Sequence, residues 1–366
     1  MRYVLASYVY TKEFNQPQAW LKRINMYTGI LDALAKSNEA ISIEQINYEG
    51  ELTQNGVNYH FRRYPKAALK YFPWDLHLYI KSLKPDVVIV HGLLFPLQVI
   101  QLRLILGRKV KIIVQNHAEK PFTGLKKLLQ RAADQMVDAN LFASHDMGME
   151  WIAAGNLKSP GKIHEVMEVS SVFYSIDRLE AKSKTGAKGN PVFLWVGRLN
   201  ENKDPLNVVR AFLKFAKSSS GAKLFMIYHT EDLLPKINQL LNSSPNKEAI
   251  ELIGEVPHAD LLYWYNSADF ILSGSHYEGS GTAICEAMSC GCVPLVTDIL
   301  SFRMITNNGE CGILYKPGNE AALLEALMQT KQMDIAEKRR LSIEYYKRNL
   351  SFEAIAERIE SIVQSL

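Results

Sequence analysis

Two carboxylates flank a glycine-rich turn in residues 274–297, GSHYEGSGTAICEAMSCGCVPLVT. The preceding ADFILSG has the apolar character of a buried strand, and glycines at 279 and 281 allow a tight turn whose backbone can approach a ligand closely. A helix is expected to begin near Thr282. Helix N-termini carry unpaired N–H groups and a partial positive charge, so Gly281 and Thr282 favour phosphate binding without a metal ion.

The two carboxylates fit a nucleotide-sugar bound at that turn. Glu286 lies one helical turn beyond Thr282, beside the expected phosphate site, where a carboxylate can accept paired hydrogen bonds from ribose hydroxyls. Glu278, in the loop before the helix, could reach the sugar. Taken alone, Glu286 could equally be a first-turn carboxylate that stabilises the helix dipole, and the glycines could form an ordinary turn.

A second segment supplies the complementary charges. Residues 191–215, PVFLWVGRLNENKDPLNVVRAFLKF, predict a buried strand, a turn after Gly197 and an amphipathic helix from near Pro205. Arg198 and Lys203 flank the turn. At the carboxyl end of a strand in an open α/β sheet, cations face the crevice where such folds bind ligands, and a diphosphate leaving group requires positive charge. Loop cations are otherwise usually solvated.

In order and spacing, residues 191–320 resemble the retaining glycosyltransferases of family 4, the glycosyl transferases group 1. The segments that carry the resemblance are GRLNENKDPL, LIGEV, DLLYWYNSADFILSGS and YEGSGTAICEAMSCGCVPLVT. It implies a hexosyltransferase that retains stereochemistry. The chain has no Asp-x-Asp motif of the kind that holds a metal ion in other transferases, so metal-independent transfer is expected. The implied catalytic residues are His117, Arg198, Lys203 and Glu278. The implied donor-binding set is Gly197, Arg198, Lys203, Glu278, Gly279, Ser280, Gly281, Thr282 and Glu286.

Strand-like apolar runs alternate with helical patterns along the whole chain, which predicts α/β architecture with parallel sheets covered by helices. The resemblance implies the GT-B arrangement, in which two Rossmann-like, doubly wound domains face a cleft. The expected domains are residues 1–177, which bind the acceptor, and 190–349, which bind the donor. Residues 178–190 lack a periodic apolar pattern and predict a linker. The helix expected at about 350–366 would pack back on the first domain.

Candidate residues for the acceptor side lie in the first half. His117 follows the strand-like KIIVQN, and the resemblance implies that it contacts the donor sugar or the reaction centre. His91 occupies a similar position, although a lone histidine in an apolar setting is more often a core residue. The family's Gly-Gly turn after the first strand is replaced here by a loop with Phe14 and Trp20, which forms either an acceptor pocket or a longer surface loop.

The charge distribution and the absence of targeting signals limit which partners and locations are expected. Residues 1–175 hold 21 Lys and Arg against 15 Asp and Glu, whereas the rest of the chain is net negative, and the basic residues occur in clusters such as FRRYPKAALKYF and LKKLLQR. Such clusters could bind anionic lipid headgroups or a lipid diphosphate acceptor at a membrane surface, or could be solvated helix faces. No nucleic-acid motif accompanies them. No signal peptide or transmembrane pattern is present, and a cytoplasmic location, possibly at the inner membrane face, is expected.

The cysteine spacing argues against a zinc site and for reduced thiols, so no metal or cofactor is expected. The substrates would be a UDP- or GDP-sugar and a glycan, lipid-linked or small-molecule acceptor, in bacterial surface polysaccharide or glycolipid synthesis. Two alternatives stay open: another enzyme of this architecture, such as a phosphorylase or a nucleotide-sugar epimerase, and a catalytically silent binding protein.

Overall fold

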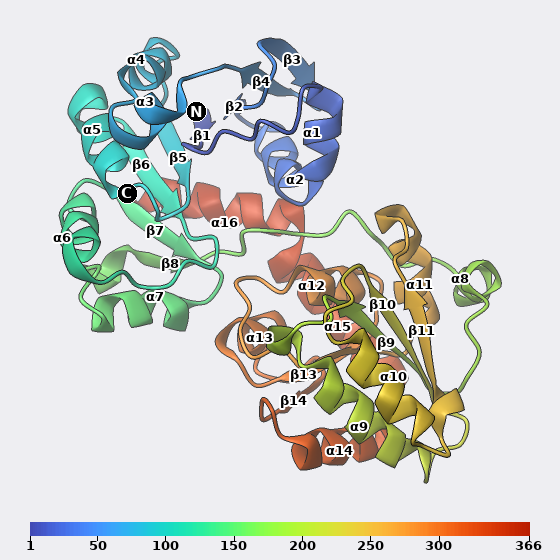
Figure 1. The fold of residues 1–366 in the computed structure, drawn as a ribbon. Helices are drawn as coiled ribbons and strands as arrows, with labels where there is room; N and C mark the ends of the chain where they lie inside the picture. Colours follow the sequence, from blue (N-terminus) through green and yellow to red (C-terminus); the bar gives the residue numbers. More distant parts are fainter. The chain divides into compact units, whose positions relative to one another are not determined.

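The computed structural model describes residues 1–366, which divide into two compact units (Figure 1). The first comprises residues 1–170 together with 352–366, and the second comprises residues 171–351. Each has its own sheet and core. None of the helices combines the length and apolar character needed to cross a membrane.

The first unit is built on an eight-stranded sheet in the order β3-β4-β2-β1-β5-β6-β7-β8. All neighbours are parallel except β3 and β4, which pair as an antiparallel hairpin. The strands are β1 Arg2–Ala6, β2 Glu39–Glu44, β3 Gly50–Gln54, β4 Val57–Phe61, β5 Val87–His91, β6 Lys111–Gln115, β7 Ala139–Phe142 and β8 Ile163–Glu165. The direction of winding reverses between β1 and β5, because β2 lies on one side of β1 and β5 to β8 lie on the other.

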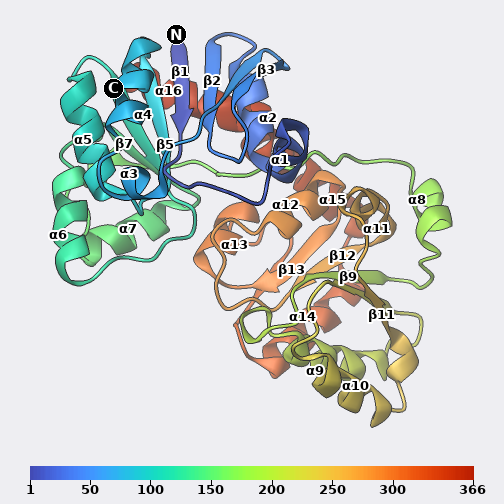
Figure 2. The ribbon, with the colours of Figure 1, turned by 45° about the horizontal axis from the view of Figure 1, so that its top comes forward.

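Helices connect and cover this sheet. They are α1 Pro17–Arg23, α2 Asn25–Leu34, α3 Lys66–Tyr71, α4 Trp74–Ser82, α5 Pro96–Leu106, α6 Gly124–Ala133, α7 His145–Ala153 and α16 Phe352–Ser365, with a short 3-10 turn at Pro160–Lys162. The last helix returns to the first unit and packs against α2 (Figure 2). This contact is close: a Cβ at Gly29 of α2 would lie 2.5 Å from the ring of Phe352.

The second unit holds a six-stranded, fully parallel sheet in the order β11-β10-β9-β12-β13-β14. Its strands are β9 Val192–Gly197, β10 Lys223–Tyr228, β11 Ile250–Gly254, β12 Phe270–Ser273, β13 Val293–Thr297 and β14 Ile313–Tyr315. Here the winding reverses between β9 and β12. Ligands of open α/β sheets bind beyond the carboxyl ends of the strands at such a reversal.

The helices of the second unit are α8 Arg178–Thr185, α9 Pro205–Ala216, α10 Leu234–Asn242, α11 Leu261–Ser267, α12 Thr282–Ser289, α13 Leu300–Ile305, α14 Glu320–Gln329 and α15 Ile335–Tyr345. Short 3-10 helices lie at Glu201–Lys203, Lys247–Ala249, His258–Asp260 and Thr330–Gln332, and a π-helical turn lies at Tyr346–Leu350. The sheet and α9 share an aromatic core, in which Phe193 stacks on Phe270 with ring centroids 4.9 Å apart.

The segment 178–190, which the sequence indicated to be a linker, instead contains α8. Asp177 caps this helix by accepting a hydrogen bond from the backbone N–H of Glu180 at 2.9 Å, and Gly186 ends it in the left-handed conformation. Only Ala181 is buried, so the helix has almost no apolar stripe to reveal it. It is held by packing on α11 and by the ion pair between Arg178 and Asp269 at 2.6 Å.

Candidate functional site

The site in the second unit forms where the winding of its sheet reverses. β9 ends at Gly197, and β12 ends just before the loop that carries Glu278 and the glycine turn. Parallel neighbouring strands end at the same edge, so the two loops expected from the sequence to hold a nucleotide-sugar lie next to each other. Arg198, directly after β9, is exposed, and its side chain makes no hydrogen bond or ion pair within the protein.

Backbone contacts hold the two loops together. The N–H of His276 donates to the carbonyl of Asn202 at 2.8 Å, and the Asn202 side chain donates to the carbonyl of Tyr277 at 3.0 Å. A Cβ at Gly274 would lie 3.1 Å from the carbonyl oxygen of Lys203, so a larger residue would crowd the backbone of the neighbouring loop. The ion pair between Lys203 Nζ and Glu278 Oε1 joins the loops again.

The turn after Glu278 leads into the first turn of α12. Gly281 is the residue before the helix, with φ 61° and ψ 49°, and no side chain caps the helix. A Cβ at Gly281 would lie 2.7 Å from Cε1 of the buried Phe302. Ser280 is buried, whereas Gly279 and Thr282 are partly exposed. The N-terminus of α12 is therefore uncapped and free to bind an anion.

Glu286 is buried inside the same unit, at 5% exposure, and both of its carboxylate oxygens are held. Oε1 lies 2.8 Å from Nε2 of His258, and Oε2 accepts a hydrogen bond from the Tyr265 hydroxyl at 3.0 Å. The hydrogen bond to Glu286 raises the pKa of His258, against the effect of burial. The ring of Phe173 packs on the imidazole, with centroids 4.9 Å apart.

His258 and Tyr265 were not identified from the sequence. His258 begins the short 3-10 helix after β11, and Tyr265 is a buried residue of α11. Neither belongs to a motif that indicates a site. Burial raises the pKa of Tyr265 well above its ordinary value, and the charge of Glu286 adds to this effect, so the phenol keeps its proton and acts as a donor.

In the first unit, the structure brings His117 and His91 together at the carboxyl ends of β6 and β5. Nδ1 of His91 lies 2.9 Å from Nε2 of His117, and Nδ1 of His117 forms an ion pair with Glu168. Burial would lower the pKa of His117, but the hydrogen bond and charge of Glu168, with the charge of Glu119, outweigh it and raise the pKa. Burial and the charge of His117 lower the pKa of His91 to about 3.

Glu168 was also missed by the sequence reasoning, because it follows β8 and lies far along the chain from both histidines. The expected acceptor residues Phe14 and Trp20 lie beside each other, with ring centroids 5.2 Å apart. Trp20 donates its indole N–H to Glu44 at 2.8 Å. Trp20 lies in α1 rather than in the loop expected from the sequence, and its hydrogen bond anchors this helix to the end of β2.

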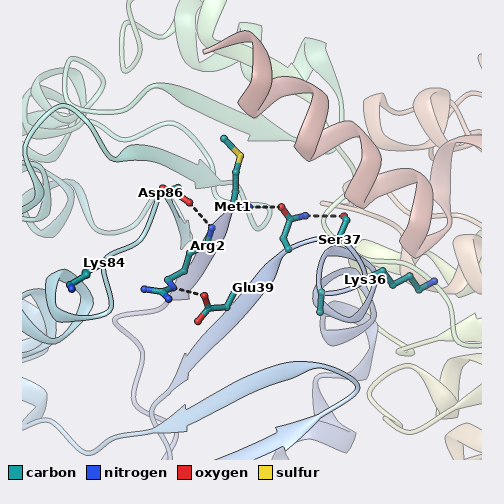
Figure 3. Close-up of a pocket in the computed structure, with 9 residues that line it drawn as sticks. Met1, Arg2, Lys36, Ser37, Glu39, Lys84 and Asp86 are labelled. Atoms are coloured by element: carbon teal, nitrogen blue, oxygen red, sulfur yellow. Dashed lines mark hydrogen bonds and ion pairs between the residues drawn. The ribbon is translucent and has the colours of Figure 1, made fainter.

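A separate hollow of about 510 Å³ lies at the amino ends of β1 and β2 (Figure 3). Several of its polar groups are paired: Arg2 pairs with Glu39 at 2.6 Å, and the backbone N–H of Arg2 donates to Asp86 at 2.7 Å. Ligands of open α/β sheets bind at the opposite ends of the strands. We therefore assign this hollow a structural role.

All four cysteines, Cys285, Cys290, Cys292 and Cys311, are free and buried, and burial raises the pKa of each thiol. They form no disulfide. The structure contains no group of three or more His, Cys, Asp or Glu side chains placed to hold a metal ion.

Residues 177–350 match the family model described as Glycosyl transferases group 1. Over its full length the chain also has the fold of GT-B glycosyltransferases. The Anabaena protein Alr3699/HepE in complex with UDP superimposes with a TM-score of 0.75, at 12% identity and 100% coverage of both chains. A glycosyltransferase from Rickettsia africae gives 0.75 at 15% identity, covering 100% of this chain and 97% of the other.

Two curated relatives match parts of the chain. The alpha-monoglucosyldiacylglycerol synthase of Acholeplasma laidlawii is 26% identical over 161 residues, which are 43% of this chain and 40% of that protein. The O-antigen chain mannosyltransferase B of Escherichia coli is 32% identical over 96 residues, which are 26% of this chain and 25% of the relative. The chain thus spans less than half the length of these relatives.

Proposed function

We propose that this protein is a nucleotide-sugar glycosyltransferase that moves a hexosyl group from a UDP- or GDP-sugar to an acceptor hydroxyl. The observation that carries this proposal is the convergence of four features at the winding reversal of the second unit. They are the unpaired Arg198, the ion pair of Lys203 with Glu278, the uncapped N-terminus of α12 and the buried carboxylate of Glu286.

Each feature has a distinct role in the proposal. Breaking the bond between the anomeric carbon and the diphosphate builds negative charge on the leaving group, which Arg198, Lys203 and the backbone N–H groups of α12 would stabilise. This set of positive charges needs no metal ion, so we propose metal-independent transfer. Glu278 would accept hydrogen bonds from hydroxyls of the donor sugar and also orient Lys203.

Glu286 would bind the ribose. His258 and Tyr265 each donate one hydrogen bond to its oxygens and so fix the carboxylate in one orientation. A carboxylate oxygen has more than one acceptor site, so Glu286 can still receive two ribose hydroxyls. The two donors also offset the cost of burying the charge. We propose retention of anomeric configuration, in line with the family.

The acceptor side is assigned to the first unit, with His117 at the reaction centre. Two relatives are named for glycolipid and surface polysaccharide synthesis, and we propose a comparable acceptor here.

Membrane-surface binding is supported by exposed apolar residues next to lysines. Leu125 and Leu128 of α6 are 74% and 60% exposed and flank Lys126 and Lys127. Vesicle binding tests this proposal. The protein should bind anionic but not neutral vesicles, and the Lys126→Glu/Lys127→Glu variant should lose this binding.

The test of the activity is calorimetric titration with UDP-, GDP- and ADP-sugars in EDTA, followed by product analysis. We expect one donor to bind, Arg198→Ala to weaken it about tenfold or more through loss of a charge-assisted bond, and sugar to pass to an acceptor. Lys188→Ala, an exposed cation outside the site, is the matched control. Binding of no donor would refute the proposal. Conversion of the bound sugar without transfer would favour an epimerase.

A further inference from the structure

The first unit contains a cavity of about 240 Å³ at the reversal of its own sheet. Ser7 after β1 and His91 at the end of β5 both line it, and the winding reverses between these two strands. This is the position where an open α/β sheet binds ligands. The wall also contains Trp20, Tyr27, Ser42, Glu44 and His117, together with leucine and isoleucine side chains.

The size and walls of the cavity limit its ligand. Its volume is below the roughly 300–1,000 Å³ of sites that hold drug-sized molecules, so it fits one ring rather than a chain of sugars. Leucine and isoleucine side chains cover much of the wall. Trp20 and Tyr27 add aromatic rings, which pack well against the C–H groups of a ring that also carries polar groups.

The polar groups of the wall provide both an acceptor and a donor. Glu44 accepts hydrogen bonds from the Trp20 indole at 2.8 Å and from the Ser42 hydroxyl at 2.6 Å, and its remaining lone pairs can accept from ligand hydroxyls. These two bonds hold the carboxylate in place. Burial raises the pKa of Glu44, against the effect of both bonds.

His91 supplies the donor. Its Nδ1 is occupied by His117, and its Nε2 makes no hydrogen bond within the protein. When His117 is protonated, as its pairing with Glu168 and its raised pKa favour, its Nε2–H donates to Nδ1 of His91. His91 is neutral because its pKa is lowered to about 3, and its one proton then lies on Nε2. The chain Glu168, His117, His91 thus fixes the tautomer of His91.

No Lys or Arg lines the cavity, and His117 is paired with the carboxylate of Glu168. A phosphate placed there would meet the carboxylate of Glu44 without a compensating cation. We propose that this cavity binds an uncharged, hydroxyl-bearing ring, namely the sugar of the acceptor that receives the transferred hexose. Its identification as the acceptor rests on the function proposed above; the neutral-ring preference does not.

Ligand-detected NMR tests this preference without any nucleotide. The probes are a panel of methyl hexopyranosides and the matching hexose 6-phosphates. We expect at least one glycoside to bind, and its 6-phosphate to bind at least about tenfold more weakly. Glu44→Gln should weaken binding of the glycoside about three- to tenfold, as expected for loss of one charged hydrogen bond. It should also reduce the difference in affinity between the glycoside and its 6-phosphate. Trp20→Phe, which removes the indole N–H, should act in the same direction.

Glu49→Gln is the matched control, because Glu49 is exposed and does not line the cavity. It should leave binding unchanged. Phosphates that bind as tightly as glycosides, a Glu44→Gln variant with unchanged binding, or no binding by any glycoside would each overturn the proposal. Nucleotide-sugar titration separates the two hypotheses. Glycoside binding without donor binding would contradict only the transferase function. Donor binding without glycoside binding would contradict only the proposal that the cavity binds a neutral ring.

Discussion

Replacing Gly281 by alanine should damage both the stability of the second unit and its affinity for a nucleotide. Gly281 has φ 61°, a conformation that costs an L-residue about 1–2 kcal/mol. An added Cβ would also lie 2.7 Å from Phe302 and 3.1 Å from Ile305, which are both buried. The residue before α12 would have to move, and the backbone N–H groups proposed to bind phosphate would move with it.

The stability lost in Gly281→Ala has two parts, the backbone strain at positive φ and the overlap of the added Cβ with its neighbours. Forcing extra volume into a packed core costs roughly a further 1–3 kcal/mol. Gly186 offers the matched control, because its φ is 68° and a Cβ there would meet nothing within 4 Å. Gly186→Ala should therefore show only the strain, and Gly281→Ala the strain and the overlap together.

Urea unfolding followed by tryptophan fluorescence measures both variants, and calorimetry with the preferred nucleotide-sugar measures affinity. Gly281→Ala should lose more stability than Gly186→Ala and should bind the donor at least about tenfold more weakly, as for loss of charge-assisted contacts. Gly186→Ala should bind normally. Equal losses in the two variants would show that contact with Phe302 is unimportant. Undiminished donor binding by Gly281→Ala would refute the role given to the N-terminus of α12.

Three further predictions concern single side chains. Glu168→Gln should lower the pKa of His117, as measured by NMR titration. Because that pKa is raised in the folded state, the pair stabilises the folded protein fully below about pH 6.5, and this contribution is lost as the pH rises through the folded pKa. The difference in stability between the variant and the wild type should therefore be larger at pH 6 than at pH 9. Glu286→Gln should lower the pKa of His258, and an unchanged titration would contradict their hydrogen bond. Asp177→Ala should cost about 0.5–2 kcal/mol in urea unfolding, and Asp177→Asn should recover most of it; no loss would mean that the cap of α8 does not contribute.

The fold was predictable because its signals are local and repeated. Buried strands such as Val192–Gly197 and Phe270–Ser273 are short apolar runs, and amphipathic helices follow them. Helix α8 was missed because it is short, charged and buried only at Ala181, so its stability comes from packing on α11. Its cap, Asp177, and its terminal Gly186 were present as signals in the sequence.

The positions of the candidate site residues were predictable where these residues lie in loops that follow strands, as Arg198 does after β9 and Glu278 after β12. The carboxyl ends of adjacent parallel strands must meet, so sequence position fixes location there. The partners of these residues come from other elements: His258 and Tyr265 hold Glu286, and Glu168 holds His117. Such pairs depend on tertiary packing across many residues, and no spacing rule in the sequence reports them.

The most direct measurement is a crystal structure of the protein with the nucleotide diphosphate of its preferred donor. The account predicts diphosphate oxygens within hydrogen-bond distance of the first backbone N–H groups of α12 and of Arg198, with the ribose hydroxyls on Glu286. A nucleotide bound elsewhere, with these groups unoccupied, would contradict it.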